Sequence, residues 1–378
     1  MVEWKKLGDI SNRNKGIPIT AGQMQELASD DGNVRVFAAG STIADINESN
    51  LPANCAYKLP SIIVKSRGYI DFEFYEKQFT HKNEMWSYSF EDRELGKFIY
   101  YFLTTKTEFF RKKAKANSVK LPQLCVADTD GYLIPIPSLA ERNRIVGILD
   151  TFTSSIENLK QQIVERRKQY EYYRDKILEL KEIDGVKMMS LLDVLEQPIT
   201  DGPHETPAFY EEGIPFISAD AIVNNKIDFN RKRGYISEEY DNICRKKYSP
   251  RLLDIYLVKS GSTTGKVAIV KTEERFNIWS PLAAIRVNKA NNPLFVYFLL
   301  QTKQVQEQVR LKSSQGSQPN LSMRALEKFN IPVPSLEEQS RIVSILDTFE
   351  ESIQNLEAQL KLREKQYEYY RNKLLTFE

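Results

Sequence analysis

The sequence predicts an α+β protein in which two α/β domains are separated by two long antiparallel coiled-coil helices, related by a pseudo-two-fold internal repeat. Two observations predict this fold. A segment near the middle of the chain recurs almost unchanged at its end, about 197 residues later, which is typical of an internal repeat. Each copy follows a stretch in which short apolar runs alternate with amphipathic segments. The predicted boundaries are 1–134 and 183–331 for the domains, and 135–182 and 332–378 for the helical segments.

Local patterns predict the elements of the two domains. Residues 61–64, 254–258 and 267–270 form short apolar runs bounded by Gly, Ser and Pro, a pattern typical of β-strands. The amphipathic stretches 95–110 and 293–311 predict one helix in each domain. Strands and helices alternate in both domains, which indicates a mixed α/β fold in each.

The repeat is clearest where each domain ends and the next helix begins. The run IPIPSL at residues 134–139 returns as IPVPSL at 331–336. The run KQYEYYR at 168–174 returns unchanged at 365–371. Over about 45 positions roughly two-thirds are identical, whereas the domains echo each other only faintly. We infer that the two helical segments share one structural role and that the two domains face different ligands.

Both helical segments open with a start signal. Ser138 with Glu141, and Ser335 with Glu338, form Ser-x-x-Glu capping boxes directly after a proline. We expect a first short helix that ends with a kink near Asp150, or near its counterpart in the second copy, and then a longer helix.

The longer helices carry apolar residues at heptad spacing, so we expect the two seams to pack against each other. Parallel and antiparallel arrangements are both sterically open, and the pseudo-two-fold favours the antiparallel one. In that register the seam arginines Arg166 and Arg363 would lie near tyrosines of the opposite helix as cation–π partners. A dimerisation coiled coil is the alternative explanation of this periodicity. The seam positions are Ile156, Leu159, Ile163, Tyr170, Tyr173, Ile177, Ile353, Leu356, Leu360, Tyr367, Tyr370 and Leu374.

Composition limits the classes of function. The 378 residues carry 53 Lys and Arg against 51 Asp and Glu, so any surface that binds a polyanion must be local. Three scattered cysteines and two histidines do not suit a metal site or a disulfide framework, and they indicate a reducing compartment. The N-terminus lacks a signal-peptide pattern, and no apolar run approaches the length of a membrane span. We therefore expect a cytoplasmic protein without a metal.

Short basic runs and one loop suit contact with a polyanion. The loop at 259–266 (KSGSTTGK) joins two predicted strands and offers lysines, hydroxyls and backbone amides, which suit phosphates or base edges. It is one residue too short for a nucleotide-binding P-loop, and Val267 stands where Ser or Thr would hold magnesium. An ordinary hairpin is the alternative. The residues expected to contact the polyanion are Lys65, Ser66, Arg67, Lys112, Lys113, Arg231, Lys232, Arg233, Lys259, Ser260, Ser262, Thr263 and Lys266.

Signatures of catalysis are missing from the sequence. The chain has no Asn-Pro-Pro-Tyr or Asp-Pro-Pro-Tyr segment that would hold a flipped adenine. It has no glycine-rich cofactor loop after a strand either. His204 lies in the stretch DGPHETP and has no nucleophile beside it in sequence, so a shaped loop is the expected structure. We therefore expect no catalytic residue.

Four of these segments together resemble a known family. They are residues 331–343 at the start of the second helical segment, 201–217 with its DGPHETP run, the KSG and GK ends of the 259–266 loop, and 316–322 before a predicted helix. The chain resembles the specificity subunits of type I restriction–modification systems over essentially its whole length, including the order of its domains. The first domain departs from the pattern, because its Ser66-Arg67-Gly68 run lacks the longer glycine-rich loop.

The resemblance implies a function that composition does not reveal. The two domains would be target recognition domains, each reading one half of a bipartite site in double-stranded DNA. The helices would set the spacing and dock two adenine methyltransferase subunits that bind S-adenosylmethionine, and motor–nuclease subunits using ATP and Mg would complete the complex. The chain itself would need no cofactor and no membrane. The alternative is a coiled-coil scaffold that joins two protein-binding modules, which predicts no salt-sensitive binding to duplex DNA.

Overall fold

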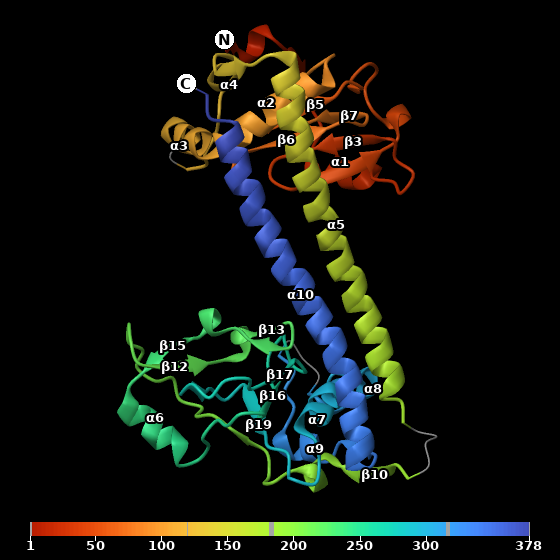
Figure 1. Cartoon of the computed structure of the whole chain (residues 1–378), viewed down its shortest axis with the longest axis vertical. Coiled ribbons are helices and arrows are strands. Elements are labelled where there is room, and N and C mark those ends of the chain that lie inside the picture. Colours follow the sequence, from red (N-terminus) through yellow and green to blue (C-terminus); the bar gives the residue numbers. More distant parts are fainter. Residues whose placement is uncertain (1, 119, 181–184, 315–317, 378) are drawn as a thin grey trace. The chain divides into compact units, whose positions relative to one another are not determined.

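The computed structural model describes residues 2–118, 120–180, 185–314 and 318–377. The chain divides into two compact units, and both long helices contribute to both of them (Figure 1). Unit 1 comprises Met1–Lys160 and Ala358–Glu378, and unit 2 comprises Gln161–Glu357. The predicted four-part division with boundaries at 134, 182 and 331 stays a prediction, and its middle boundary lies outside the described residues. Gly316 of the 316–322 segment also lies outside them.

Unit 1 contains two sheets, a two-stranded ribbon and short helices. An antiparallel sheet has the order β2-β8-β5-β6, a second has the order β4-β3-β7 with β3 and β7 parallel, and β1 pairs with β9. Its strands are β1 Glu3–Lys6, β2 Asn12–Lys15, β3 Val34–Phe37, β4 Ile43–Ile46, β5 Ser61–Lys65, β6 Asp71–Tyr75, β7 Phe79–His81, β8 Trp86–Ser89 and β9 Leu133–Ile136. Its shorter helices are α1 Ala21–Leu27, α2 Arg93–Thr105, α3 Thr107–Asn117 and α4 Val126–Asp130.

Unit 2 repeats this arrangement. Its sheets have the orders β11-β19-β16-β17 and β15-β12-β18, the latter with β12 and β18 parallel, and β10 pairs with β20. A small hairpin, β13–β14, is added. Its strands are β10 Lys187–Ser190, β11 Thr200–Asp201, β12 Ile214–Ile217, β13 Ile222–Val223, β14 Lys226–Ile227, β15 Gly234–Ile236, β16 Ile255–Val258, β17 Val267–Ile269, β18 Asn277–Ile278, β19 Leu282–Ile285 and β20 Asn330–Val333. Its shorter helices are α6 Glu238–Arg245, α7 Pro293–Leu300, α8 Lys303–Lys312 and α9 Met323–Glu327.

A close backbone approach recurs at the same place in both units and explains a glycine in each. Gly16 directly follows β2, and a Cβ there would lie 2.1 Å from the backbone oxygen of Lys82. Gly202 directly follows β11, and a Cβ there would lie 2.0 Å from the backbone oxygen of Ile278. No side chain fits at either position. The faint sequence echo between the two domains is therefore a repeat of the fold itself, which confirms the predicted internal repeat.

The predicted strands are confirmed as β5, β16 and β17, and the predicted helices need a correction. Each amphipathic stretch forms two helices, α2 and α3 in unit 1 and α7 and α8 in unit 2. In unit 2 the break lies at Thr302, whose hydroxyl accepts a hydrogen bond from the N–H of Val305 and caps a new helix. Periodicity continued across the break and hid it from the sequence.

The two long helices are α5, Leu139–Ile177, and α10, Leu336–Leu374, of 39 residues each. Both capping serines accept a hydrogen bond at 3.3 Å, Ser138 from the N–H of Glu141 and Ser335 from the N–H of Glu338. The predicted short helix and kink near Asp150 are wrong, because α5 continues through this position. No proline interrupts it, and the Asp150 carboxylate binds side chains of α2 rather than the backbone of its own helix.

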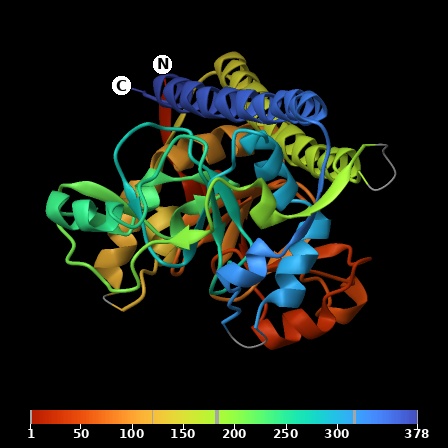
Figure 2. The ribbon, with the colours of Figure 1, turned by 90° about the horizontal axis from the view of Figure 1, so that it is seen from below.

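Within each unit the segments of α5 and α10 run antiparallel, side by side in both views (Figure 1 and Figure 2). In unit 1, Phe152 stacks on Tyr370 at 5.4 Å, and Lys160 lies 3.7 Å from Glu364. In unit 2, Arg167 binds Glu357 at 2.5 Å, and Tyr173 stacks on Phe349 at 5.6 Å. Residue numbers rise along one helix as they fall along the other, which confirms the antiparallel prediction.

The predicted seam positions are mostly buried or half-buried. The most buried positions are Ile156, Ile163, Tyr170 and Ile353, and the half-buried ones are Leu159, Ile177, Leu356, Leu360, Tyr367 and Leu374. Tyr173 and Tyr370 are 43% and 41% exposed, so they lie at the edge of the seam. The expected cation–π pairs are corrected as well: Arg363 lies over Phe152 at 5.6 Å, and Tyr170 and Tyr367 are covered by arginines of their own helices.

Candidate nucleic-acid interface

The loop between β16 and β17 of unit 2, residues 259–266, is anchored at its base by a distant segment. The N–H of Gly261 donates to the backbone oxygen of Pro319 at 3.0 Å, and the N–H of Leu321 donates to that of Lys259 at 2.7 Å. Gly261 has φ +95°, a conformation that favours glycine. Two segments singled out from the sequence, 259–266 and 318–322, therefore form one surface.

Unit 1 anchors its shorter loop after β5 in the same way. The N–H of Gly68 donates to the backbone oxygen of Pro122, and the N–H of Leu124 donates to that of Ser66, both at 2.9 Å. Gly68 has φ +75°. Residues 66–70 are thus the counterpart of the unit 2 loop. The sequence had matched the Ser66-Arg67-Gly68 run to this loop, and the backbone anchor, which the sequence does not reveal, shows that the match is structural.

A buried carboxylate organises the cations beside the unit 2 loop. Asp201, at the end of β11, is 1% exposed. Its Oδ1 lies 2.5 Å from Nζ of Lys247, and its Oδ2 lies 3.3 Å from Nζ of Lys259 and 3.2 Å from Nε2 of His204. Burial alone would raise the pKa of Asp201, but the ammonium groups of Lys247 and Lys259 lower it below its usual value. Asp201 is therefore ionised and holds three side chains in place.

The side chains around Asp201 face different ways. Lys259 is only 11% exposed, whereas Lys247 and His204 are 54% and 70% exposed. Both ring nitrogens of His204 are engaged, because Nδ1 lies 2.9 Å from Oγ of Ser280. Lys247 keeps ammonium protons that point to solvent. The cluster thus holds the ammonium of Lys247 at the surface, beside the buried carboxylate of Asp201.

Three of the residues expected to contact a polyanion have partners inside the protein. Ser66 is fully buried, and its hydroxyl donates to the backbone oxygen of Glu84 at 2.6 Å. Lys259 is paired with Asp201 as described. Lys65 binds Glu73 at 2.8 Å, and its side chain is 16% exposed. Ser66 and Lys259 are not surface groups, which corrects the expectation of an accessible loop side chain at these two positions.

The other expected residues lie at the surface. Lys113 binds Asp128 at 3.1 Å, and Arg231 lies 3.6 Å from Asp228. Arg233 lies over the ring of Trp279 at 5.3 Å, and Lys232 lies over that of Tyr235 at 4.6 Å. Those with exposed side chains are Arg67, Lys112, Lys113, Arg231, Arg233, Ser262 and Lys266, and those half-buried are Lys232, Ser260 and Thr263.

Sequence reasoning missed the residues that organise this surface. Asp201 and His204 lay in a segment interpreted as a shaped loop, and Lys247 was not among the residues expected to contact a polyanion. Trp279, the support of Arg233, was not among them either. The run DGPHETP was the one usable signal, because it places a carboxylate and an imidazole three residues apart.

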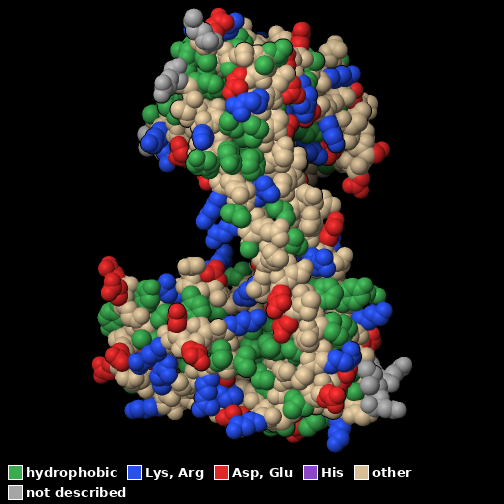
Figure 3. Space-filling model, viewed as in Figure 1, with side chains coloured by type: hydrophobic (Ala, Val, Ile, Leu, Met, Phe, Trp, Pro, Cys, Tyr) green, Lys and Arg blue, Asp and Glu red, His purple; other side chains and the backbone are tan. Residues whose placement is uncertain are grey.

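Basic and acidic side chains are mixed on the face drawn in Figure 3, where Lys and Arg are interspersed with Asp and Glu over both units. This agrees with the near balance of 53 basic and 51 acidic residues. On this face, contact with a polyanion would therefore rest on a few placed cations rather than on a large basic patch.

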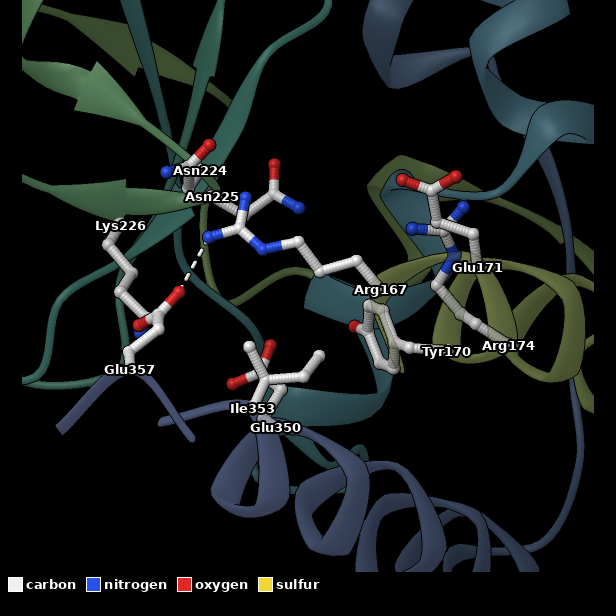
Figure 4. Close-up of a pocket in the computed structure, with 10 residues that line it drawn as sticks. All are labelled: Arg167, Tyr170, Glu171, Arg174, Asn224, Asn225, Lys226, Glu350, Ile353 and Glu357. Carbon is white, nitrogen blue, oxygen red and sulfur yellow. Dashed lines mark hydrogen bonds and ion pairs between the residues drawn. The ribbon is translucent and has the colours of Figure 1, made fainter. Parts of the chain in front are cut away.

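A concavity of about 140 Å³ in unit 2 lies between α5, α10 and the β13–β14 turn (Figure 4). Arg167 binds Glu357 across it at 2.5 Å. The hydroxyl of Tyr170 is buried and has no hydrogen-bond partner within the described part of the chain. The cations of the lining, Arg167, Arg174 and Lys226, are matched by Glu171, Glu350 and Glu357. This balance of charge favours no particular ligand.

The long helices carry the same surface twice. In unit 2 the helix patch consists of Arg166, Tyr173, Ile345, Thr348, Phe349 and Ser352, and all of these except Tyr173 line a groove of about 390 Å³. The helix patch of unit 1 consists of the repeat-related Arg363, Tyr370, Ile148, Thr151, Phe152 and Ser155, which are the same residue types. Other exposed positions on the helices are shared in part: Tyr172 recurs as Tyr369, whereas Val164 is replaced by Lys361.

Two classes of site find no support in the described residues. No group of three or more His, Cys, Asp or Glu side chains among them could hold a metal ion. No helix among them is long and apolar enough to cross a membrane.

Comparisons with known proteins agree with this architecture. Residues 1–166 and 184–363 match the family described as type I restriction modification DNA specificity domain. The specificity subunit of the type I restriction enzyme EcoR124I/EcoR124II of Escherichia coli is 30% identical over 398 residues, covering 100% of this chain and 94% of that protein.

Solved structures share the fold at lower identity. The S subunit of a type I restriction–modification system from M. genitalium is 17% identical, with a TM-score of 0.62 over 100% of this chain and 97% of that chain. A chain from a structure on complex assembly and conformational transition of the type I R-M system is 16% identical, with a TM-score of 0.55 over 99% of this chain and 96% of that chain. The family match covers most of both repeats. The chain therefore belongs to the family of type I restriction–modification DNA specificity subunits.

Proposed function

We propose that each unit reads one half of a bipartite site in double-stranded DNA. One observation carries the proposal: the same backbone anchor presents different side chains in the two units. The exposed Arg67 of unit 1 occupies the position of the half-buried Ser260 in unit 2, and the buried positions before them hold Ser66 and Lys259. Base edges are read by individual side chains on a fixed scaffold. A duplicated scaffold with diverged side chains therefore suits two different half-sites.

The cations around each loop suit the phosphates of the same duplex. Arg67 and Lys112 are exposed in unit 1, and Lys247 and Lys266 are exposed in unit 2. Phosphate contacts fix the register of a protein on DNA, and each one releases counterions. The proposal therefore requires affinity that falls as salt rises, although the net charge of the chain is only +2.

We also propose that methylation and cleavage are the work of partner subunits. The two helix patches offer one surface twice, which suits two copies of the same partner, an adenine methyltransferase. S-adenosylmethionine would bind to those subunits, and ATP and Mg to motor–nuclease subunits. The chain itself would act without a cofactor. Type I enzymes assemble from separate subunits, as the names of the relatives in E. coli and M. genitalium indicate.

The test compares the purified chain with the chain co-expressed with the modification subunit of its own system. The chain alone should neither methylate nor cleave DNA, and the pair should methylate adenine at one bipartite sequence, read out by methylation-sensitive sequencing. Affinity for a duplex carrying that sequence should fall with salt. Arg67→Ala and Lys266→Ala should each reduce the slope of log affinity against log salt by about one. Salt-independent association, or none, would favour the scaffold alternative.

A further inference from the structure

The guanidinium of Arg233 in unit 2 lies over an aromatic ring at the surface. The backbone N–H of Arg233 donates to the oxygen of Phe216 at 2.8 Å, and its guanidinium lies over the ring of Trp279 at 5.3 Å. The Trp279 ring in turn contacts Phe216, which is fully buried. The side chain of Arg233 is nevertheless 50% exposed. An aromatic support restricts the rotation of a guanidinium without using its N–H donors.

The neighbouring polar side chains have partners inside the protein, whereas the ionic partner of Arg233 is weak. Lys247 is tied to Asp201 at 2.5 Å, and both ring nitrogens of His204 are engaged. The ionic contact of Arg233 is with Asp220 at 3.8 Å, a side chain that is 77% exposed. An exposed contact at this distance contributes little. The five N–H donors of Arg233 are thus available at a fixed orientation.

This geometry suits the edge of a base better than a phosphate. A phosphate also accepts the arginine fork, but its oxygens can be approached from many directions, so a support that restricts the guanidinium adds less there. Guanine presents two acceptors, O6 and N7, side by side in the major groove, and a planar arginine fork matches them. Fixing the plane in advance reduces the entropy lost on binding.

In unit 1 the arginines over aromatic rings are tied to carboxylates: Arg111, over Tyr69 at 4.9 Å, donates to Glu108, and Arg35, over Tyr75 at 5.5 Å, donates to Asp45. Trp86, the tryptophan that echoes Trp279 in sequence, lies inside β8, is 7% exposed and donates from Nε1 to the hydroxyl of Thr129 at 2.9 Å. Its ring supports no arginine at the surface. The assignment therefore concerns one half of the site.

We propose that Arg233 reads a guanine by paired hydrogen bonds to O6 and N7, and that Trp279 positions it. The proposal rests on the proposed function, because it names the base that unit 2 recognises within its half-site. A single G·C pair of one half-site should depend on Arg233, and the other half-site should not.

The experiment uses the chain with its modification subunit and duplexes carrying the methylated sequence of the wild-type complex. Each guanine is replaced in turn by 7-deazaguanine, which lacks the N7 acceptor. Wild type should lose about tenfold to hundredfold in affinity at one guanine of one half-site. Arg233→Ala should bind all four base pairs at that position equally and should be insensitive to 7-deazaguanine there. Arg233→Ala, and the Arg233→Lys variant described next, should retain the thermal unfolding midpoint of the wild type, since the side chain of Arg233 is exposed.

Arg233→Lys separates base reading from phosphate contact, because it keeps the charge and loses the planar fork. Base reading by a planar fork requires this variant to have a weaker preference for guanine while keeping its salt dependence, because a lysine can approach O6 and N7 without the fork. The matched control, Arg231→Ala, should weaken binding equally for every sequence. Three results would overturn the proposal: a half-site without guanine, an unchanged preference in Arg233→Ala, or an undiminished preference in Arg233→Lys. Failure of the wild-type complex to bind any duplex would instead refute the proposed function.

Discussion

Asp201 illustrates how a single buried residue can determine a surface. Its carboxylate is 1% exposed and contacts Lys259 from within the unit and Lys247 at the surface. A buried charge is tolerated only when opposite charges and hydrogen bonds surround it. The cluster is therefore a structural unit first, and the exposed ammonium of Lys247 is positioned as a consequence.

Asp201→Asn should lower the free energy of unfolding by about 3 kcal/mol, because Lys259 would remain buried without its counter-charge. The lowered pKa of Asp201 adds a pH signature. The stabilisation is present above the usual pKa of an aspartate and is lost as pH falls through the lower folded-state pKa. Urea denaturation measures the loss at neutral pH. Asp220→Asn, at a side chain that is 77% exposed, is the control and should change stability by less than about 0.5 kcal/mol. An equal loss in both variants would contradict the role given to Asp201.

His81 gives unit 1 a separate dependence on pH. The side chain is buried in β7, where its ring nitrogens lie 3.2 Å from the backbone oxygen of Lys82 and 3.1 Å from Oγ of Ser87. Burial lowers the pKa of His81 to about 4. Between pH 6.5 and 4 the unfolded chain binds a proton that the folded chain excludes, so stability falls as pH falls through this window.

The contribution of His81 should reach about 3 kcal/mol at the acid end of that window. His81→Gln removes the titrating group and keeps an amide that can replace a ring nitrogen. The difference in unfolding free energy between wild type and variant should therefore shift in favour of the variant as pH falls from 7 to 4.5. Denaturation curves at several pH values measure this difference. A difference that stays constant with pH would show that His81 is not buried as a neutral imidazole.

Burial of single polar residues could not be predicted from the sequence. Lys259 was expected at the surface because it opens a loop with hydroxyls and glycines. Its burial depends on Asp201, a residue of another strand that is distant in sequence. Ser66 was misjudged for the same reason, since its acceptor is the backbone oxygen of Glu84. Patterns of neighbouring residues carry no information about such partners.

The long helices, unlike the burial of single polar residues, could be predicted from the sequence, because the residues that determine a helix are close together in the chain. Capping boxes fixed the starts of α5 and α10, and heptad spacing identified their buried faces. The kink near Asp150 was predicted wrongly because the change in amphipathic pattern reflects a change of partner. Ile145 and Leu149 contact the core of unit 1, and the pattern shifts where α5 leaves that core. A helix can change its buried face without a change in its backbone.

Each helix patch should bind one modification subunit independently of the other patch. Tyr173→Ala should reduce the number of bound modification subunits from two to one, Tyr370→Ala should do the same, and the double variant should bind none. Both rings are exposed by about two-fifths, so each variant should lose less than about 1 kcal/mol of stability. Light scattering on the purified complexes measures the stoichiometry. Leu362→Ala is the matched control, at an exposed helix position where the copies differ. Loss of a partner in that variant, or two partners retained in the double variant, would contradict the assignment.

Over the whole chain, the two copies of the helical segment are nearly identical, whereas the two copies of the domain differ in sequence. Both units use the same strand orders and the same anchored loop, yet near-identity is confined to the ends of the domains and the helices. The proposed function would account for this contrast, with one partner type on the helices and a distinct half-site on each unit. The sequence revealed the repeat clearly in the helices and faintly in the units, where the strand orders make it plain.

The length of the helices is the property of the whole chain that can be tested most directly. Each helix of 39 residues is about 58 Å long at about 1.5 Å per residue. Deleting residues 156–162 and 353–359 removes one heptad from each helix and shortens each by about 10 Å. The contacts of Phe152 with Tyr370 in unit 1 and of Tyr173 with Phe349 in unit 2 involve none of the deleted residues. The apolar seam also stays in phase, because a heptad is a whole repeat.

If the helices set the spacing of the two readers, the unread spacer of the methylated site should contract by about three base pairs, since DNA rises about 3.4 Å per base pair. Binding could also collapse, because three base pairs rotate one half-site by a large fraction of a helical turn. Inserting one heptad in each helix should lengthen the spacer by the same amount. Sequencing of methylated sites in cells that carry each variant measures both changes. Full methylation at the original spacer in the deletion variant would show that the distance is set elsewhere in the chain.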